Sequence, residues 1–176
     1  MRNLLLMLVV GCLFSVGTRA AAASGPVIWL DDFAKAQKQA QTSGRPILAD
    51  FTGSDWCGWC MKLDKEVFRE KLFQSYARSN LVLFVADFPR GKRQAPRLIK
   101  QNEALQQKYQ VQGFPTLFLL DAEGKVLAQT GYLPGGAAAY VTNLQALLRQ
   151  AGWTPPVATN AVKQAAAPAG VPAVAR

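Results

Sequence analysis

Four short apolar runs along the chain have the length of buried β-strands. They cover residues 46–51, 81–86, 116–120 and 126–130. The last two flank the turn Asp121-Ala122-Glu123-Gly124, which places a glycine where a hairpin needs a positive φ. The pattern therefore predicts two buried central strands followed by a C-terminal hairpin.

Apolar residues at helical spacing lie between these strands. A first helix follows a cap at Asp31 or Asp32 and ends near Gly44. Its apolar face consists of Phe33, Ala36 and Ala40. A second helix begins at the cysteine pair of positions 57 and 60, and its apolar positions are Met61, Leu63, Val67, Phe68 and Leu72.

Two further helices complete the pattern. A polar helix covers about residues 97–109, and the last helix covers about residues 136–150. The apolar positions of the last helix are Tyr140, Leu144, Leu147 and Leu148. The resulting order is βαβαβαββα with apolar central strands, which predicts an α/β fold with a mixed central sheet and helices on both faces.

Composition restricts the chemistry of this fold. The chain has 176 residues and a formal net charge of +9, and it contains no histidine. Ser-His-Asp and Cys-His catalysis and imidazole-dependent metal sites are therefore excluded. The three cysteines, Cys12, Cys57 and Cys60, are too few for a four-thiolate zinc site within one chain. The length suits one compact domain with residues left over at the ends.

The N-terminal residues 1–23 have the pattern of a signal peptide, with a basic start, an apolar run and small residues near Ala20. An uncleaved anchor and a lipoprotein box ending at Cys12 are the alternatives. Cleavage after Ala20 removes Cys12 and leaves only Cys57 and Cys60, in a periplasmic or secreted location where disulfides persist. Residues 154–176 are rich in Ala, Pro and Val and predict a disordered tail, so the folded domain is 27–153.

Cys57 and Cys60 lie three residues apart at the start of a helix that follows a buried strand. The helix N-terminus stabilises a thiolate on the first cysteine, and the second lies one turn further, close enough to attack a mixed disulfide. Cys57 is therefore the predicted exposed nucleophile and Cys60 the resolving thiol. Half of a zinc site is one alternative. A structural disulfide is the other, although so short a loop gains only about 2 kcal/mol.

The chain resembles the thioredoxin superfamily at several places. Residues 47–51 before Trp56-Cys57-Gly58-Trp59-Cys60 resemble its central strand, and Gly113-Phe114-Pro115-Thr116 resembles its proline loop. Gly124-Lys125-Val126 resembles its final hairpin, and residues 131–148 its closing helix. The Cys-Gly-Trp-Cys centre is most similar to exported bacterial thioredoxin-like proteins. The resemblance implies a thioredoxin-like fold and a dithiol oxidoreductase that needs no cofactor or metal.

The resemblance also implies roles for single residues. Pro115 corresponds to a cis-proline that, with Phe114 and Thr116, faces an extended substrate segment. Asp50 corresponds to a buried carboxylate whose raised pKa suits it to take the Cys60 proton. An ordinary trans proline and a satisfied strand-end carboxylate are the alternatives.

Two tryptophans flank the cysteines. Trp56 corresponds to an aromatic shield beside the first thiol, or simply packs on the loop. Trp59 stands where thioredoxins have proline and strong exported oxidants have histidine. Since a tryptophan brings no charge to the thiolate, we expect a potential on the reducing side.

The sequence departs from the family around the carboxylate. One more residue separates Asp50 from Cys57 than in ordinary thioredoxins. The lysine that pairs with this carboxylate is also missing, and Leu83 or a neighbour occupies its place.

A basic loop at residues 88–96, with Arg90, Lys92 and Arg93, is an insertion relative to a minimal thioredoxin. It steers acidic partners or is a solvated surface. Arg97 and Lys100 follow it. Aromatic residues do not alternate with these cations, so the pattern does not indicate nucleic-acid binding.

Together these features predict an exported monomer that reduces disulfides in protein substrates and is recycled by a membrane electron donor. The same dithiol can also serve an oxidase or isomerase. A Cu(I) chaperone and a non-catalytic interaction module are the remaining alternatives.

Overall fold

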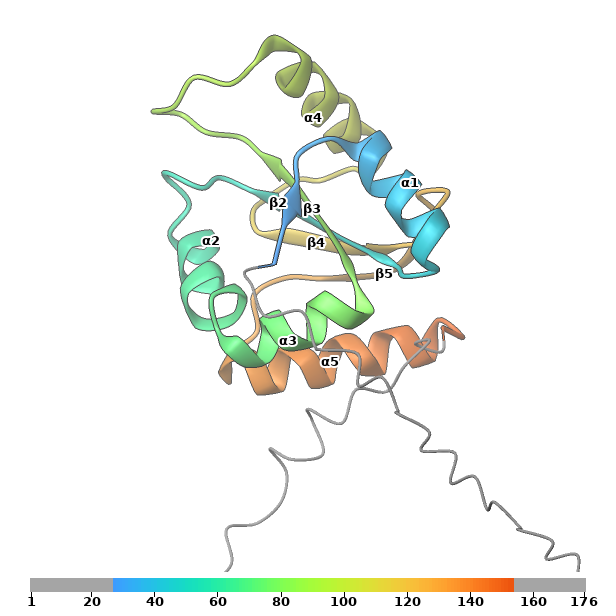
Figure 1. The fold of residues 1–176 in the computed structure, drawn as a ribbon. Helices are drawn as coiled ribbons and strands as arrows, with labels where there is room; N and C mark the ends of the chain where they lie inside the picture. Colours follow the sequence, from blue (N-terminus) through green and yellow to red (C-terminus); the bar gives the residue numbers. More distant parts are fainter. Residues whose placement is uncertain (1–26, 154–176) are drawn as a thin grey trace, which may run out of the picture.

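The computed structural model describes residues 27–153 (Figure 1). The predicted signal peptide, the lipidation site at Cys12 and the predicted tail lie outside the described residues. None of the helices within 27–153 combines the length and the apolar character that crossing a membrane requires.

Five strands form one mixed sheet in the order β1-β3-β2-β4-β5. β1, β3 and β2 are parallel, whereas β4 is antiparallel to β2 and β5 is antiparallel to β4. The strands are β1 (Trp29–Leu30), β2 (Ile47–Thr52), β3 (Val82–Asp87), β4 (Thr116–Leu120) and β5 (Val126–Thr130). The apolar runs predict all of them except β1, which has only two residues.

Helices cover both faces of this sheet, as predicted (Figure 1). They are α1 (Phe33–Ser43), α2 (Gly58–Leu63), the π-helix η1 (Asp64–Phe68), α3 (Lys71–Asn80), α4 (Pro96–Lys108) and α5 (Gly136–Gln150). The Asp32 carboxylate caps α1 by accepting the Lys35 N–H, and Gly44 ends it with φ 66°. Asp32 is therefore the cap, rather than Asp31.

Side chains that alternate along β2 separate two apolar cores. Leu48 packs with η1, α3 and α5 on one face. Ile47, Ala49 and Phe51 pack with α1 and α4 on the other. Asp50 shares the face of Leu48 by this alternation, so its carboxyl is directed toward the α2 and η1 side of the sheet.

The prediction of one continuous helix after the cysteines is wrong, because Glu70 is extended with φ −73° and ψ 136°, and a separate helix, α3, begins at Lys71. The helical segment before this break, α2 and η1, is also irregular. The Arg69 N–H donates to the Asp64 carbonyl oxygen at 3.0 Å, five residues away, which is the spacing of a π-turn. The additional residue in this turn brings both Val67 and Phe68 into the core, while Met61 is 46% exposed. A 3.6-residue period cannot reveal such an insertion, because the apolar residues around it still look regularly spaced.

Candidate active site

The two cysteines lie where β2 passes into α2. Cys57 is the N-cap of α2, and the Cys60 N–H donates to Cys57 Sγ at 3.2 Å. The pair forms a disulfide with a Cα–Cα distance of 5.2 Å. The helix terminus therefore directs an amide donor at the first sulfur, which is the arrangement that stabilises a thiolate after reduction.

Both cysteines are largely covered in this disulfide state. Cys57 is 7% exposed and Cys60 is 4% exposed. The expected exposure of Cys57 is thus not seen here, because its sulfur is bonded to Cys60 and lies over the amide at the helix terminus. What distinguishes the two cysteines is the capping position of Cys57 rather than its accessibility.

Asp50 lies below the disulfide in the middle of β2. It is 6% exposed, and its Oδ1 atom has no hydrogen-bond partner among the described residues. Burial, reinforced by the nearby carboxylates of Asp87 and Asp64, raises the pKa of Asp50 to about 8. The alternative of a satisfied strand-end carboxylate is therefore wrong. The group is a neutral acid over most of the physiological range.

The strand register identifies the residue that replaces the missing lysine. Val85 of β3 is the direct partner of Asp50, whereas Leu83 pairs with Leu48. Val85, rather than Leu83, therefore stands beside the Asp50 carboxylate where the family has its lysine. An apolar side chain there leaves Asp50 without a counter-ion on the sheet.

The proline loop lies at the start of β4. The Phe114–Pro115 peptide bond is cis, which excludes the trans alternative. Thr116 pairs with Phe51 of β2, and its hydroxyl donates to the Gly113 carbonyl oxygen at 2.7 Å. Phe114, Pro115 and Thr116 are all partly exposed, as a surface that contacts an extended segment requires.

Trp56 is held by three neighbours rather than lying loosely on the surface. Its indole N–H donates to the Phe88 carbonyl oxygen at 2.8 Å, and its ring packs edge-on against Phe114 at 5.9 Å between centroids. The Arg90 guanidinium lies 3.7 Å above its ring centroid. Trp56 therefore links the cysteine loop (residues 53–56, before Cys57) to the proline loop and the basic loop.

Trp59 lies on the other side of the cysteines and is 58% exposed. Its ring packs against Tyr132 at 5.1 Å between centroids, and the Lys62 ammonium lies 5.1 Å from the Trp59 ring. The Tyr132 hydroxyl donates to the Glu66 carboxylate at 2.8 Å. An aromatic surface thus adjoins the disulfide at Trp59.

Hydrogen bonds that the sequence does not predict join the basic loop to the cysteine loop. The Asp55 carboxylate accepts the N–H groups of Arg90 and Gly91 at 3.0 and 2.7 Å. These bonds hold the pKa of Asp55 below its ordinary value. Asp87 accepts both the N–H and the hydroxyl of Ser54, at 2.9 and 2.6 Å. No local signal marks these pairs, because more than thirty residues separate their members.

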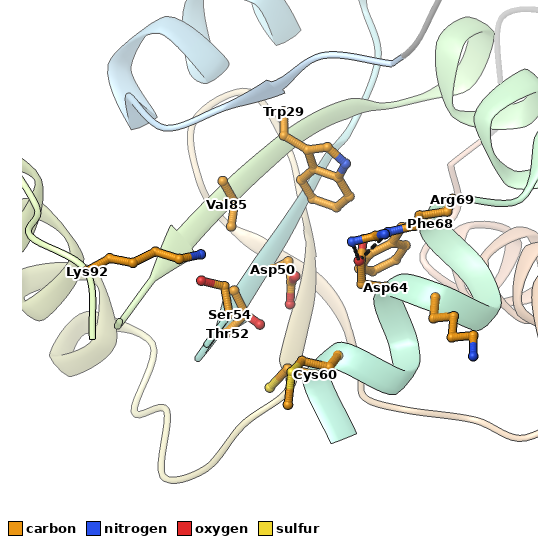
Figure 2. A pocket seen from close by; sticks show the side chains of 12 residues that line it. Trp29, Asp50, Thr52, Ser54, Cys60, Asp64, Phe68, Arg69, Val85 and Lys92 are labelled. Atoms are coloured by element: carbon orange, nitrogen blue, oxygen red, sulfur yellow. Dashed lines mark hydrogen bonds and ion pairs between the residues drawn. The ribbon is translucent and has the colours of Figure 1, made fainter. Parts of the chain in front are cut away.

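A pocket of about 590 Å³ opens beside Cys60 (Figure 2). Asp50 and Thr52 come from β2, Val85 from β3 and Lys92 from the basic loop. The twelve described residues that line it include none from the proline loop. The pocket thus gives Asp50 and Cys60 a route to solvent that is separate from the proline-loop surface.

The sequence matches the thioredoxin-like domain family over residues 33–146. It is 38% identical over 132 residues to the disulfide bond reductase DsbH of Chlamydia pneumoniae, covering 75% of this chain and 78% of that protein. It is 28% identical to the thioredoxin-related protein DsbJ of the same organism, over 73% of this chain and 39% of DsbJ.

Among solved structures, a DsbH oxidoreductase superposes with a TM-score of 0.69 at 38% sequence identity, covering 76% of this chain and 91% of that one. The family match over residues 33–146 includes the dithiol segment and the strands β2, β3, β4 and β5. The chain thus belongs to the thioredoxin-like family, and its Cys57–Cys60 pair makes it a thiol–disulfide oxidoreductase.

Proposed function

We propose that this protein is exported and, as a monomer, reduces disulfides in protein substrates. The observation that supports reduction, rather than oxidation, of substrates is the environment of Cys57. Its sulfur accepts the Cys60 N–H at the helix terminus, and the intervening Trp59 contributes no charge. Because the Cys57 thiolate is stabilised only modestly, the dithiol form is not strongly favoured and the reduction potential of the Cys57–Cys60 couple is low. The similarity to a protein named a disulfide bond reductase supports the same direction.

The first step is attack by the Cys57 thiolate on a substrate disulfide. A bond forms between Cys57 Sγ and one substrate sulfur, the substrate S–S bond breaks, and the other substrate sulfur leaves as a thiolate. Phe114, Pro115 and Thr116 receive the substrate segment, and Trp56 and Trp59 flank it. The partly exposed proline loop next to Trp56 supports this placement.

The second step releases the reduced substrate. The Cys60 thiol gives its proton to the Asp50 carboxylate, and the resulting thiolate attacks Cys57 Sγ. The Cys57–Cys60 bond forms, and the second substrate sulfur leaves as a thiolate that takes a proton from water. Two electrons have passed from the dithiol to the substrate. A membrane electron donor then returns the protein to the dithiol.

The reduction potential of the Cys57–Cys60 couple tests the direction. It is measured by equilibrating the protein with defined glutathione buffers and separating the two forms after alkylation. We expect a value near or below about −220 mV. A value near about −120 to −150 mV would assign the protein to the oxidases or isomerases.

Substrate contact is tested by trapping. In Cys60→Ser the mixed disulfide on Cys57 cannot be resolved, so we expect covalent adducts with disulfide-containing proteins. Cys57→Ser is the matched control and should give none. Adducts in equal amount from both variants would contradict the assignment of Cys57 as nucleophile.

Export is tested by the mass of the protein recovered outside the cytoplasm. Cleavage near Ala20 predicts a chain that lacks Cys12. A lipid-modified Cys12 at the new N-terminus would instead place the protein on a membrane, and an intact Met1 start would contradict cleavage.

A further inference from the structure

Charged groups from several elements lie around Asp50, and the charges of Asp87 and Asp64 raise its pKa. Asp87 ends β3, and Asp64 lies on η1. The buried Tyr140 of α5 also interacts with Asp50, and both burial and the Asp50 charge raise the pKa of Tyr140. The cations that line the pocket are Lys65, Arg69 and Lys92.

The two other carboxylates already have partners. Arg69 forms an ion pair with Asp64 at 2.6 Å, drawn as a dashed line in Figure 2. Ser54 donates two hydrogen bonds to Asp87. Asp50 differs, since its Oδ1 has no hydrogen-bond partner within the described residues and its neighbour across the sheet is Val85. The ionised form of Asp50 therefore lacks a compensating charge on the sheet.

Lys92 lines the same pocket as Asp50 and can supply that charge, and its ammonium also lowers the pKa of Asp55. Figure 2 shows its side chain extended from the basic loop, with the ammonium directed toward Thr52 and Ser54 and with Asp50 beyond them. The preceding residue is fixed, because the Gly91 N–H donates to Asp55 at 2.7 Å. The side chain itself is exposed, so it has room to turn further into the pocket.

We propose that Lys92 is a positioning residue that stabilises the ionised Asp50 carboxylate and so readies it to accept the Cys60 proton. This inference rests on the role proposed above for Asp50. The loop that carries Lys92 lies outside the sheet, so the cation reaches the carboxylate through the pocket rather than along the strand that holds Val85.

The proton balance explains why a cation is needed. Asp50 accepts a proton only while it is ionised, and a carboxyl with a pKa of about 8 is ionised in only about a tenth of molecules at pH 7. When the Cys60 S–H bond breaks and the Asp50 O–H bond forms, Lys92 keeps its own proton throughout. Its charge acts only by raising the ionised fraction of Asp50.

The experiment is a titration of the Asp50 carboxyl by carbon-13 NMR in the oxidised full chain, with Asp50→Asn used to assign the signal. We expect Lys92→Gln to raise the apparent pKa of Asp50 by about one pH unit. Lys92→Arg, which keeps the charge, should restore the original value. The pH profile of substrate reduction should shift in Lys92→Gln in the same direction and by a similar amount.

Two variants remove the same charge elsewhere. Arg93→Gln changes the same loop at a position that does not line the pocket, and Lys65→Gln removes another cation that lines it. Both should shift the Asp50 pKa much less than Lys92→Gln does. An equal shift from either variant, or no shift in Lys92→Gln, would overturn the assignment of Lys92.

The two proposals fail in different ways. If Asp50→Asn reduces substrate as fast as the unmodified protein, the proton-accepting role of Asp50 is wrong, whatever the titration of Lys92→Gln shows. If Asp50→Asn is slow but Lys92→Gln leaves both the Asp50 pKa and the pH profile unchanged, only the role of Lys92 is wrong.

Discussion

At the scale of single residues, Asp50 shows how burial sets chemistry. Its strand neighbours Ala49 and Phe51 are fully buried, and the carboxyl is excluded from water almost as completely. The charged form therefore costs more free energy in the folded protein than in the unfolded chain, and the pKa rises from 3.8 to about 8. The burial that raises this pKa therefore also lowers the stability of the fold wherever Asp50 is ionised.

The pH dependence of stability measures that cost. Between the unfolded pKa of 3.8 and the folded pKa of about 8, the folded chain holds a proton that the unfolded chain has released. Stability contributed by this group is thus full below pH 4 and falls as pH rises toward 8, by up to about 1.4 kcal/mol per pH unit.

We therefore expect Asp50→Asn to gain stability relative to the unmodified oxidised protein as pH rises from 5 to 8.5. Guanidinium unfolding at several pH values checks this. Parallel curves for the two proteins across that range would show that the pKa of Asp50 is not raised.

Gly53 illustrates a close approach between residues in the same loop. A Cβ atom at this position would lie 2.5 Å from Cε2 of the Trp56 ring. That ring cannot move freely, because Phe88 binds its N–H and Arg90 lies over its face. The glycine is what lets Trp56 fold back over the loop.

We expect Gly53→Ala to destabilise the protein by about 1–3 kcal/mol and to change the Trp56 fluorescence. Gly58→Ala is the control for stability, since a Cβ there meets nothing within 4 Å. Unfolding free energies from guanidinium titrations compare the two. If Gly58→Ala lost as much free energy of unfolding as Gly53→Ala, steric overlap with the Trp56 ring would not be the cause.

At the scale of elements, the loop between β3 and α4 acts as a support for the cysteine loop. Asp55 holds its backbone, and Phe88 stacks on Phe114 with ring centroids 5.0 Å apart. The basic residues Arg90, Lys92 and Arg93 are exposed, and two of them also lie against neighbouring structure. Arg90 packs on Trp56, and Lys92 lines the pocket.

We expect Asp55→Asn to loosen this support, because Arg90 and Gly91 donate to different carboxylate oxygens and an amide keeps only one oxygen acceptor. Amide hydrogen exchange at Arg90 and Gly91 should accelerate by about tenfold. Glu123→Gln, on the exposed hairpin turn, removes the same charge and should leave that exchange unchanged. Unaltered exchange in Asp55→Asn would show that the loop is held by other contacts.

At the scale of the whole molecule, two cores on opposite faces of one sheet hold the dithiol at the end of β2. The redox state of Cys57 and Cys60 is coupled to the stability of this assembly. A reducing couple means that the folded protein favours the disulfide more than the unfolded chain does, by about 1.4 kcal/mol for each 30 mV.

We therefore expect the oxidised protein to unfold at a higher guanidinium concentration than the reduced protein. Tryptophan fluorescence follows both transitions, and a Cys57→Ser, Cys60→Ser double variant should not respond to reductant. Greater stability of the reduced form would indicate an oxidant and contradict the proposed direction.

The hydrophobic pattern by itself predicted four of the five strands and the α/β class, but neither β1 nor the order of the strands in the sheet. Residues 116–120 and 126–130, and the turn at Gly124 with φ 83°, appear in the structure as the sequence predicts. Local periodicity and turn chemistry suffice for these elements, because each one buries a face that its own residues define. Cys57 and Cys60 were equally evident, since their spacing alone brings the two sulfurs together.

Only the tertiary structure decided what surrounds the dithiol. The π-turn at η1, the pairing of Asp50 with Val85 and the attachment of Arg90 to Trp56 all join residues whose relation no local period encodes. The raised pKa of Asp50 has the same origin, because burial depends on which elements close over a strand. Sequence spacing thus placed the two sulfurs, whereas long-range packing placed the charged groups around them.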